Sequence, residues 1–117
     1  MRSFILVFLV SVLLLGCGQS WKEEPYEVIW INGTSSLGYN VGNGAYIGRV
    51  DFPMHIASNE NYISVYACED SVCSFYYIDK VKDHKYADHG EFVYGPFSKD
   101  TFSAIKDNLG LPNIEIK

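Results

Sequence analysis

Two cysteines five positions apart, each at the end of a run of alternating residues, constrain the fold of this chain more than any other feature. The runs 62–68 and 73–79 alternate aliphatic residues with tyrosine, phenylalanine and serine. Such alternation is typical of β-strands. If Cys68 faces Cys73 in an antiparallel hairpin, the register is fixed, because the numbers of opposed residues then sum to 141.

The register predicted for this hairpin also agrees with its hydrophobic pattern. The opposed pairs are Tyr66 with Phe75, Ser64 with Tyr77, and Ile63 with Ile78. A tyrosine opposite a phenylalanine is a favourable cross-strand pair. The cysteine spacing and the apolar pattern therefore predict one arrangement, with residues 69–72 as the connecting loop.

The first sixteen residues have the order of a secretory signal peptide. Arg2 supplies a positive charge, residues 4–15 form an apolar run with a single serine, and the small residue Gly16 precedes Cys17. An apolar run of about twelve residues is too short for the roughly twenty that cross a bilayer as a helix. We therefore expect residues 1–16 to be a signal peptide.

The sequence Leu14-Leu15-Gly16-Cys17 resembles the lipobox of bacterial lipoproteins. The resemblance implies that the Cys17 sulfur receives a diacylglyceryl group, that cleavage follows Gly16, and that the new amino group is acylated. Two or more acyl chains anchor a protein stably. The implied location is the cell membrane. In a Gram-negative host the outer membrane is favoured, because Gly18 is not the aspartate that usually retains lipoproteins at the inner membrane.

The charge of the mature chain limits its partners. The 101 residues that follow the signal peptide carry 8 basic and 14 acidic side chains. A negative chain is a poor match for nucleic acid and for electrostatic adhesion to anionic lipid. We expect no nucleic-acid partner and membrane attachment through lipid on Cys17. By length we expect a lipidated cysteine and tether at 17–25 and a single globular domain at 26–117.

The other two cysteines are expected to form a disulfide. Lipidation of Cys17 leaves Cys68 and Cys73 as an even pair in an oxidising compartment. The alternative is a pair of free, buried thiols. A zinc site would need two further ligands nearby.

The rest of the mature chain indicates short strands followed by one helix. Further strands are expected at 26–31, 37–41, 45–50, 54–57, 91–94 and 113–117. Ser98 can cap a helix that Gly110 ends, with Phe102, Ile105 and Leu109 on its buried face. The expected fold class is α+β: an antiparallel β-sheet with one C-terminal helix packed on a face, after the lipoprotein signal peptide.

A charged segment at 81–90, expected to be an exposed loop, is the best candidate for chemistry. Asp83, His84, Asp88 and His89 could bind a divalent metal, but three neighbouring lysines oppose a cation. A serine hydrolase is not indicated, because the sequence contains no Gly-x-Ser-x-Gly motif. We therefore expect no catalytic residues, no metal and no cofactor.

Aromatic residues give a candidate partner-binding face. Tyr62, Tyr66, Phe75 and Tyr77 share one face of the predicted hairpin. One helix covers only one face of a sheet, and tyrosine is enriched at protein interfaces. These four side chains are therefore candidates for contact with a partner. The alternative is that they form the core, with the aliphatic side chains of the hairpin outside.

The second half of the chain, over 61–110, also looks like small uncharacterised bacterial lipoproteins. The motifs that carry this likeness are Asn61-Tyr62-Ile63-Ser64-Val65, Tyr76-Tyr77-Ile78-Asp79-Lys80, Tyr94-Gly95-Pro96-Phe97-Ser98 and Phe102. The resemblance implies a β-rich fold with one late helix and brings no activity. Proteins of similar build include immunity proteins, lysozyme inhibitors and phage exclusion lipoproteins.

The expected function is that of a lipid-anchored, non-enzymatic cell-envelope protein that binds another protein, of the immunity, inhibitor or exclusion type. The alternative is a lipoprotein of envelope maintenance or assembly. A small hydrolase is the third interpretation.

Overall fold

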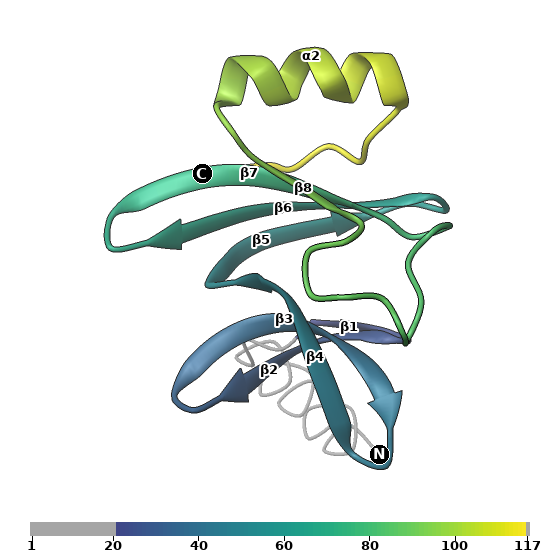
Figure 1. Cartoon of the computed structure of the whole chain (residues 1–117). Coiled ribbons are helices and arrows are strands. Elements are labelled where there is room, and N and C mark those ends of the chain that lie inside the picture. The colour runs from purple at the N-terminus through teal and green to yellow at the C-terminus, as the bar shows by residue number, and fades with distance from the viewer. Residues whose placement is uncertain (1–20, 117) are drawn as a thin grey trace, which may run out of the picture.

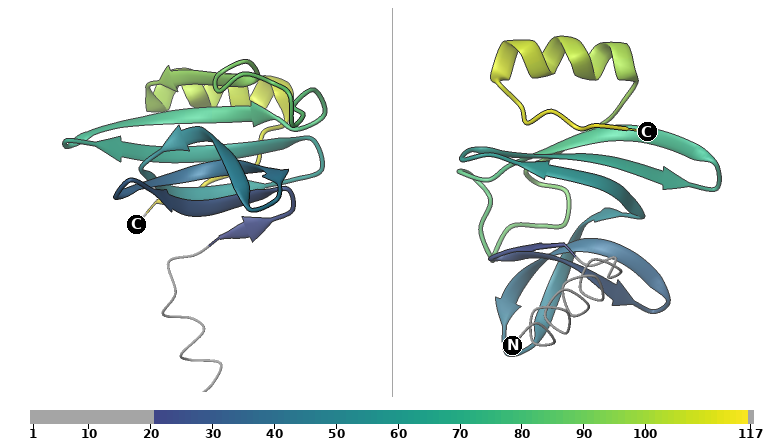
Figure 2. Two further views of the ribbon diagram at one scale, coloured as in Figure 1. Left: turned by 60° about the horizontal axis from the view of Figure 1, so that its bottom comes forward. Right: turned by 180° about the vertical axis from the view of Figure 1, so that it is seen from behind.

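The computed structural model of the chain describes residues 21–116, which form two antiparallel β-sheets and one helix in three layers (Figure 1). The first sheet contains, in spatial order, β1 (Lys22–Glu23), β2 (Tyr26–Ile31), β3 (Thr34–Gly42) and β4 (Ala45–Asp51). The second contains β5 (Pro53–Ser58), β6 (Tyr62–Glu69), β7 (Val72–Asp79) and β8 (Val93–Phe97). Helix α2 (Lys99–Leu109) covers the outer face of the second sheet (Figure 2). The predicted antiparallel sheet and C-terminal helix are confirmed, but the strands form two sheets rather than one.

Phe52 is the residue at which the chain leaves the first sheet and enters the second. Its φ of 56° turns the backbone sharply. Its N–H donates to the carbonyl oxygen of Ser35 in the first sheet at 2.9 Å, and its own carbonyl accepts from the N–H of Cys68 in the second at 3.1 Å. Pro53 follows as the first residue of an edge strand, a position that needs no ladder donor. The strand end predicted at this point is therefore a change of sheet.

The main core lies between the two sheets. Its buried side chains are Tyr26, Leu37 and Val50 from the first sheet and Ile63, Val65, Ala67 and Ile78 from the second. Each fully buried aliphatic side chain contributes about 1.5–3 kcal/mol. A second cluster, made of Phe75, Phe102 and Leu111, lies between the second sheet and α2. Both faces of the second sheet are therefore covered.

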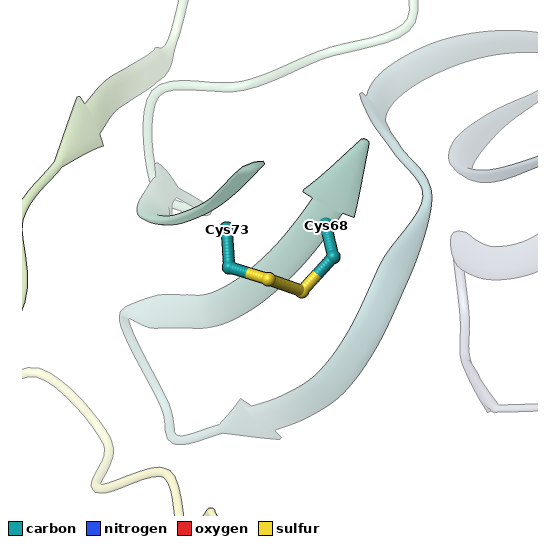
Figure 3. Close-up of a disulfide and its surroundings, with 2 residues drawn as sticks. All are labelled: Cys68 and Cys73. Carbon is teal, nitrogen blue, oxygen red and sulfur yellow. A yellow bond between two sulfur atoms is a disulfide. The ribbon is translucent and has the colours of Figure 1, made fainter. Parts of the chain in front are cut away.

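The β6–β7 hairpin has the predicted disulfide and the predicted register. Cys68 is bonded to Cys73 across the two strands (Figure 3). Tyr66 opposes Phe75, and in every opposed pair along the hairpin the two residue numbers sum to 141, as predicted. The connecting loop is shorter than predicted: the ladder continues beyond the disulfide, which leaves Asp70–Ser71 as the turn, with φ of 51° and 70°. Positive φ at both positions matches the right-handed twist of a tight hairpin.

Helix α2 begins and ends at the predicted residues. The Ser98 side chain accepts a hydrogen bond from the N–H of Thr101 at 3.3 Å, and Gly110 closes the helix in the left-handed conformation with φ 75°. The predicted apolar face is right for Phe102, which is buried, and wrong for Leu109, which is 39% exposed. Leu111, beyond the turn at Gly110, is buried in the helix–sheet cluster. The left-handed turn redirects the chain, so the helical pattern does not continue through it.

Removal of the helix cap should destabilise the protein modestly. Ser98→Ala should lower the free energy of unfolding by about 1 kcal/mol, because the amide of Thr101 loses its acceptor. Ser103→Ala, at an exposed interior position of the same helix, should raise it by a few tenths of a kcal/mol, because alanine has roughly that much more helix propensity than serine. Chemical denaturation of both variants checks the difference. Equal losses would contradict the cap.

The predicted tether at 17–25 is too long, because the folded domain already includes Trp21–Pro25. The carbonyl of Trp21 accepts from the N–H of Val28 at 2.9 Å, and its side chain packs on the main core. Nζ of Lys80 donates a hydrogen bond to Oε1 of Glu23 at 2.7 Å, and this hydrogen bond lowers the pKa of the Glu23 carboxyl. The predicted signal peptide at 1–16 and the predicted lipidation site Cys17 lie outside the described residues.

Two further predicted boundaries near the C-terminus differ from the structure. Strand β8 begins at Val93 rather than residue 91, and it continues through Gly95-Pro96, where a strand end was predicted. Proline is tolerated there because β8 is an edge strand with an irregular register at this point. Residues 113–116 do not form the predicted last strand. Instead, Asn113, Ile114 and Ile116 line a groove beside α2.

Candidate functional site

The segment between β7 and β8 contains the most unusual interior feature of the protein. Sequence analysis predicts an exposed loop at 81–90, but Ala87 is buried and the Asp83 side chain is only 1% exposed. Figure 1 shows this green loop descending from the second sheet to the first. The loop is confirmed and eight of its ten residues are exposed; Asp83 is buried because it has a charged partner in the first sheet.

That partner is Arg49, which is placed by a β-bulge. Leu37 pairs with Val50 and Gly38 with Gly48, so Arg49 is the extra residue in strand β4. A bulge can redirect a side chain, and here Arg49 is buried with its side chain 1% exposed. Its Nε donates to Oδ2 of Asp83 and its Nη2 to Oδ1, both at 2.9 Å. Nη2 also donates to the carbonyl oxygen of His84 at 3.1 Å.

Two tyrosines complete this buried polar network. The Tyr26 hydroxyl donates to Oδ2 of Asp83 at 2.9 Å, and the Tyr39 ring lies 5.0 Å from the guanidinium carbon of Arg49, a cation–π distance. Burial, together with the negative charge of Asp83, raises the pKa of Tyr26 above its ordinary value. Burial likewise raises the pKa of Tyr39. Tyr26 therefore stays protonated and acts as a donor to the carboxylate.

One nitrogen of Arg49 remains outside this network. Nη1 is buried, and no acceptor among residues 21–116 lies within hydrogen-bond distance of it. Arg49 lines a cleft of about 460 Å³ between the two sheets. The other lining residues are Val50, Asp51, Ala67, Glu69, Asp70, Val72, Ser74, Tyr76, His89 and Pro96. We call this feature the Arg49 cleft.

The candidate metal ligands of the loop have separate roles. Asp83 is bonded to Arg49 and Tyr26, whereas Nδ1 of His84 accepts from the N–H of Tyr86 at 3.1 Å. Nδ1 of His89 contacts the carbonyl oxygen of Gly48 on β4. Within the described part of the chain, no three histidine, cysteine or acidic side chains are grouped to hold a metal ion.

The predicted aromatic face is not open. Phe75 is 8% exposed and stacks on Phe102 of α2 with 4.9 Å between ring centres, and Tyr62, Tyr66 and Tyr77 are partly buried in the same cluster. The opposite, aliphatic face of the hairpin is also buried, against the first sheet. Neither of the two alternatives drawn from the sequence predicts that both faces of the hairpin are covered. The first sheet covers the aliphatic face, and α2 covers the aromatic face.

A groove of about 530 Å³ remains beside α2, with two of the predicted binding residues on its wall. Tyr66 and Phe75 line it together with Phe102 and the side chains of Lys99 and Lys106. Partner binding by the aromatic residues at this groove stays a prediction.

The Arg49–Asp83 pair is not predicted from the sequence, although the position of Arg49 gives one signal for it. Arg49 lies within the predicted strand 45–50, next to Val50, and a buried arginine almost always needs a charged partner. That rule predicts a carboxylate for Arg49 without saying which one. Nothing in the charged segment distinguishes Asp83 from Asp88 as that partner.

The fold and this site together define a small, mostly β protein with a disulfide, two antiparallel four-stranded sheets and one C-terminal helix. No protein-family profile, curated protein or solved structure matches the chain. Within residues 21–116, no helix has the length and apolar character that a membrane crossing requires.

Proposed function

We propose that the protein is a lipid-anchored, non-enzymatic cell-envelope protein that binds another protein. The lipobox-like sequence ending at Cys17 supports the anchor. The disulfide between Cys68 and Cys73 supports an oxidising compartment, because such bonds persist outside the cytosol.

The Arg49 cleft carries the proposal of a binding function. An arginine keeps its charge at every physiological pH, so it recognises ligands as a hydrogen-bond donor and does not act as an acid or base. The only other buried ionisable groups of this network, Asp83 and Tyr26, are bonded to each other and hold the loop in place. A buried donor at the wall of a cleft, with no base or nucleophile bonded to it in the network, suits recognition; His89 and Ser74 line the same cleft outside the network.

The anchor is tested by metabolic labelling with palmitate in the bacterial host. Cys17→Ser should abolish incorporation of label and leave an unprocessed precursor. Cys73→Ser is the matched control, because it removes a cysteine of the domain and should leave the label in place. Label at wild-type level in Cys17→Ser would contradict the anchor. Density-gradient fractionation then identifies the membrane.

Protein binding is tested by photo-cross-linking in intact cells. A photoreactive amino acid at Ser74, within the Arg49 cleft, should give a discrete protein adduct. The same amino acid at Asp107, on the exposed side of α2, should give none. The identity of the adduct separates an exogenous protein, expected for an inhibitor, from an envelope component, expected for an assembly factor. Absence of any adduct at Ser74 would contradict the proposal.

A further inference from the structure

We infer that the Arg49 cleft binds a cationic segment of the partner protein. A main-chain carbonyl of the segment accepts a hydrogen bond from Nη1 of Arg49, and a lysine or arginine side chain lies against the acidic rim of the cleft, formed by Asp51, Glu69 and Asp70. This inference rests on the proposed function and specifies the chemistry of its partner.

The first argument is the unused donor. Asp83 occupies the edge of the guanidinium formed by Nε and Nη2, so Nη1 lies on the far side of the planar group from the carboxylate. A buried donor without an acceptor destabilises a protein, so an acceptor supplied by a ligand stabilises the complex. Since Asp83 already balances the charge of Arg49, the position calls for a neutral acceptor such as a peptide carbonyl.

The second argument is the charge of the rim. Asp51, Glu69 and Asp70 are exposed side chains, and Arg49 is the only lysine or arginine among the residues lining the cleft. An anion would meet three carboxylates before it reached the buried nitrogen. A cation is attracted to the same rim, and complementary charge of this kind raises association rates and selects partners.

The third argument is the shape and stiffness of the cleft. Its volume of about 460 Å³ suits one long side chain with its flanking peptide groups. Ala67, Val72 and Pro96 form apolar wall against which the stem of a lysine or arginine can pack. Glu69 ends β6 and Asp70 begins the turn just beyond the disulfide, so this part of the rim is fixed before binding.

The test uses short peptides of opposite charge. The pentapeptides acetyl-Ala-Ala-Lys-Ala-Ala-amide and acetyl-Ala-Ala-Glu-Ala-Ala-amide are titrated into ¹⁵N-labelled protein purified from membranes in neutral detergent. The lysine peptide should shift the amide signals of residues 69–74 and the guanidinium signals of Arg49, with affinity about tenfold above that of the glutamate peptide. Equal affinities, absence of saturable shifts, or the same shifts from inorganic phosphate would overturn the inference.

Variants separate the two contacts. Glu69→Lys combined with Asp70→Lys should reverse the peptide preference, since both side chains are exposed at the tip of the β6–β7 hairpin. Asp107→Lys combined with Glu115→Lys changes the net charge equally on α2 and the C-terminal segment and should leave the preference unchanged. Arg49→Lys retains a charge beside Asp83 but lacks Nη1, so both peptides should bind about tenfold more weakly. A thermal melt checks that this last variant folds, and the rim variants decide the question if it does not.

The two proposals can fail independently. An adduct at Ser74 in cells without peptide discrimination would overturn the cationic segment and leave protein binding intact. Peptide discrimination without any adduct in cells would overturn protein binding as the function of the cleft.

Discussion

Replacing Asp83 with alanine should lower the free energy of unfolding by about 3–5 kcal/mol. The substitution leaves the guanidinium of Arg49 buried without its carboxylate, and it removes the acceptor of the Tyr26 hydroxyl. The loop also loses its side-chain ion pair with the first sheet, although His84 and His89 keep their contacts with β4. Chemical denaturation followed by circular dichroism measures the loss.

Two variants make this result specific to the buried pair. Asp88→Ala, exposed in the same loop, should change stability by no more than about 0.5 kcal/mol. Arg49→Met combined with Asp83→Leu should recover most of the loss, because apolar replacements of a buried ion pair are often neutral or stabilising, by about 1–4 kcal/mol. Equal stabilities for Asp83→Ala and Asp88→Ala would show that the ion pair does not hold the loop.

Phe102→Ala should destabilise the protein by about 3–5 kcal/mol, as expected for loss of a buried aromatic ring. Phe102 is 4% exposed, and its ring stacks on Phe75 at an interplanar angle of 22°. The ring joins α2 to the second sheet, so its removal leaves a cavity in the cluster that packs the helix on the sheet.

Leu109→Ala on the same helix is the matched control. Leu109 is 39% exposed, and its truncation should lower the free energy of unfolding by only about 1 kcal/mol. Neither substitution changes a capping residue of α2, and denaturant melts compare the two variants. Similar losses for the two would mean that α2 packs less closely on the sheet than the structure shows.

Features determined by neighbouring residues were predictable from the sequence. The register of the β6–β7 hairpin follows from two cysteines and the alternation around them, and the limits of α2 follow from Ser98 and Gly110. In each case the interacting residues lie within a few positions of one another. Local chemistry therefore leaves few alternatives.

Features that depend on distant residues were not predictable. Arg49 and Asp83 are 34 positions apart, and nothing near Asp83 marks it as buried. An alternating pattern also tells which side chains share a face but not what covers that face. For this reason the sequence leaves open whether the aromatic side chains of the hairpin meet a partner or form a core, and in the structure α2 covers them.

Each sheet is assembled from strands that are consecutive in the sequence, and this arrangement has a consequence for the nascent chain. The first four strands leave the ribosome before Asp83 does. Until Asp83 arrives, closing the first sheet around Arg49 would desolvate an uncompensated positive charge. The amino-terminal half should therefore remain open during synthesis, and final closure should wait for the segment that follows β7.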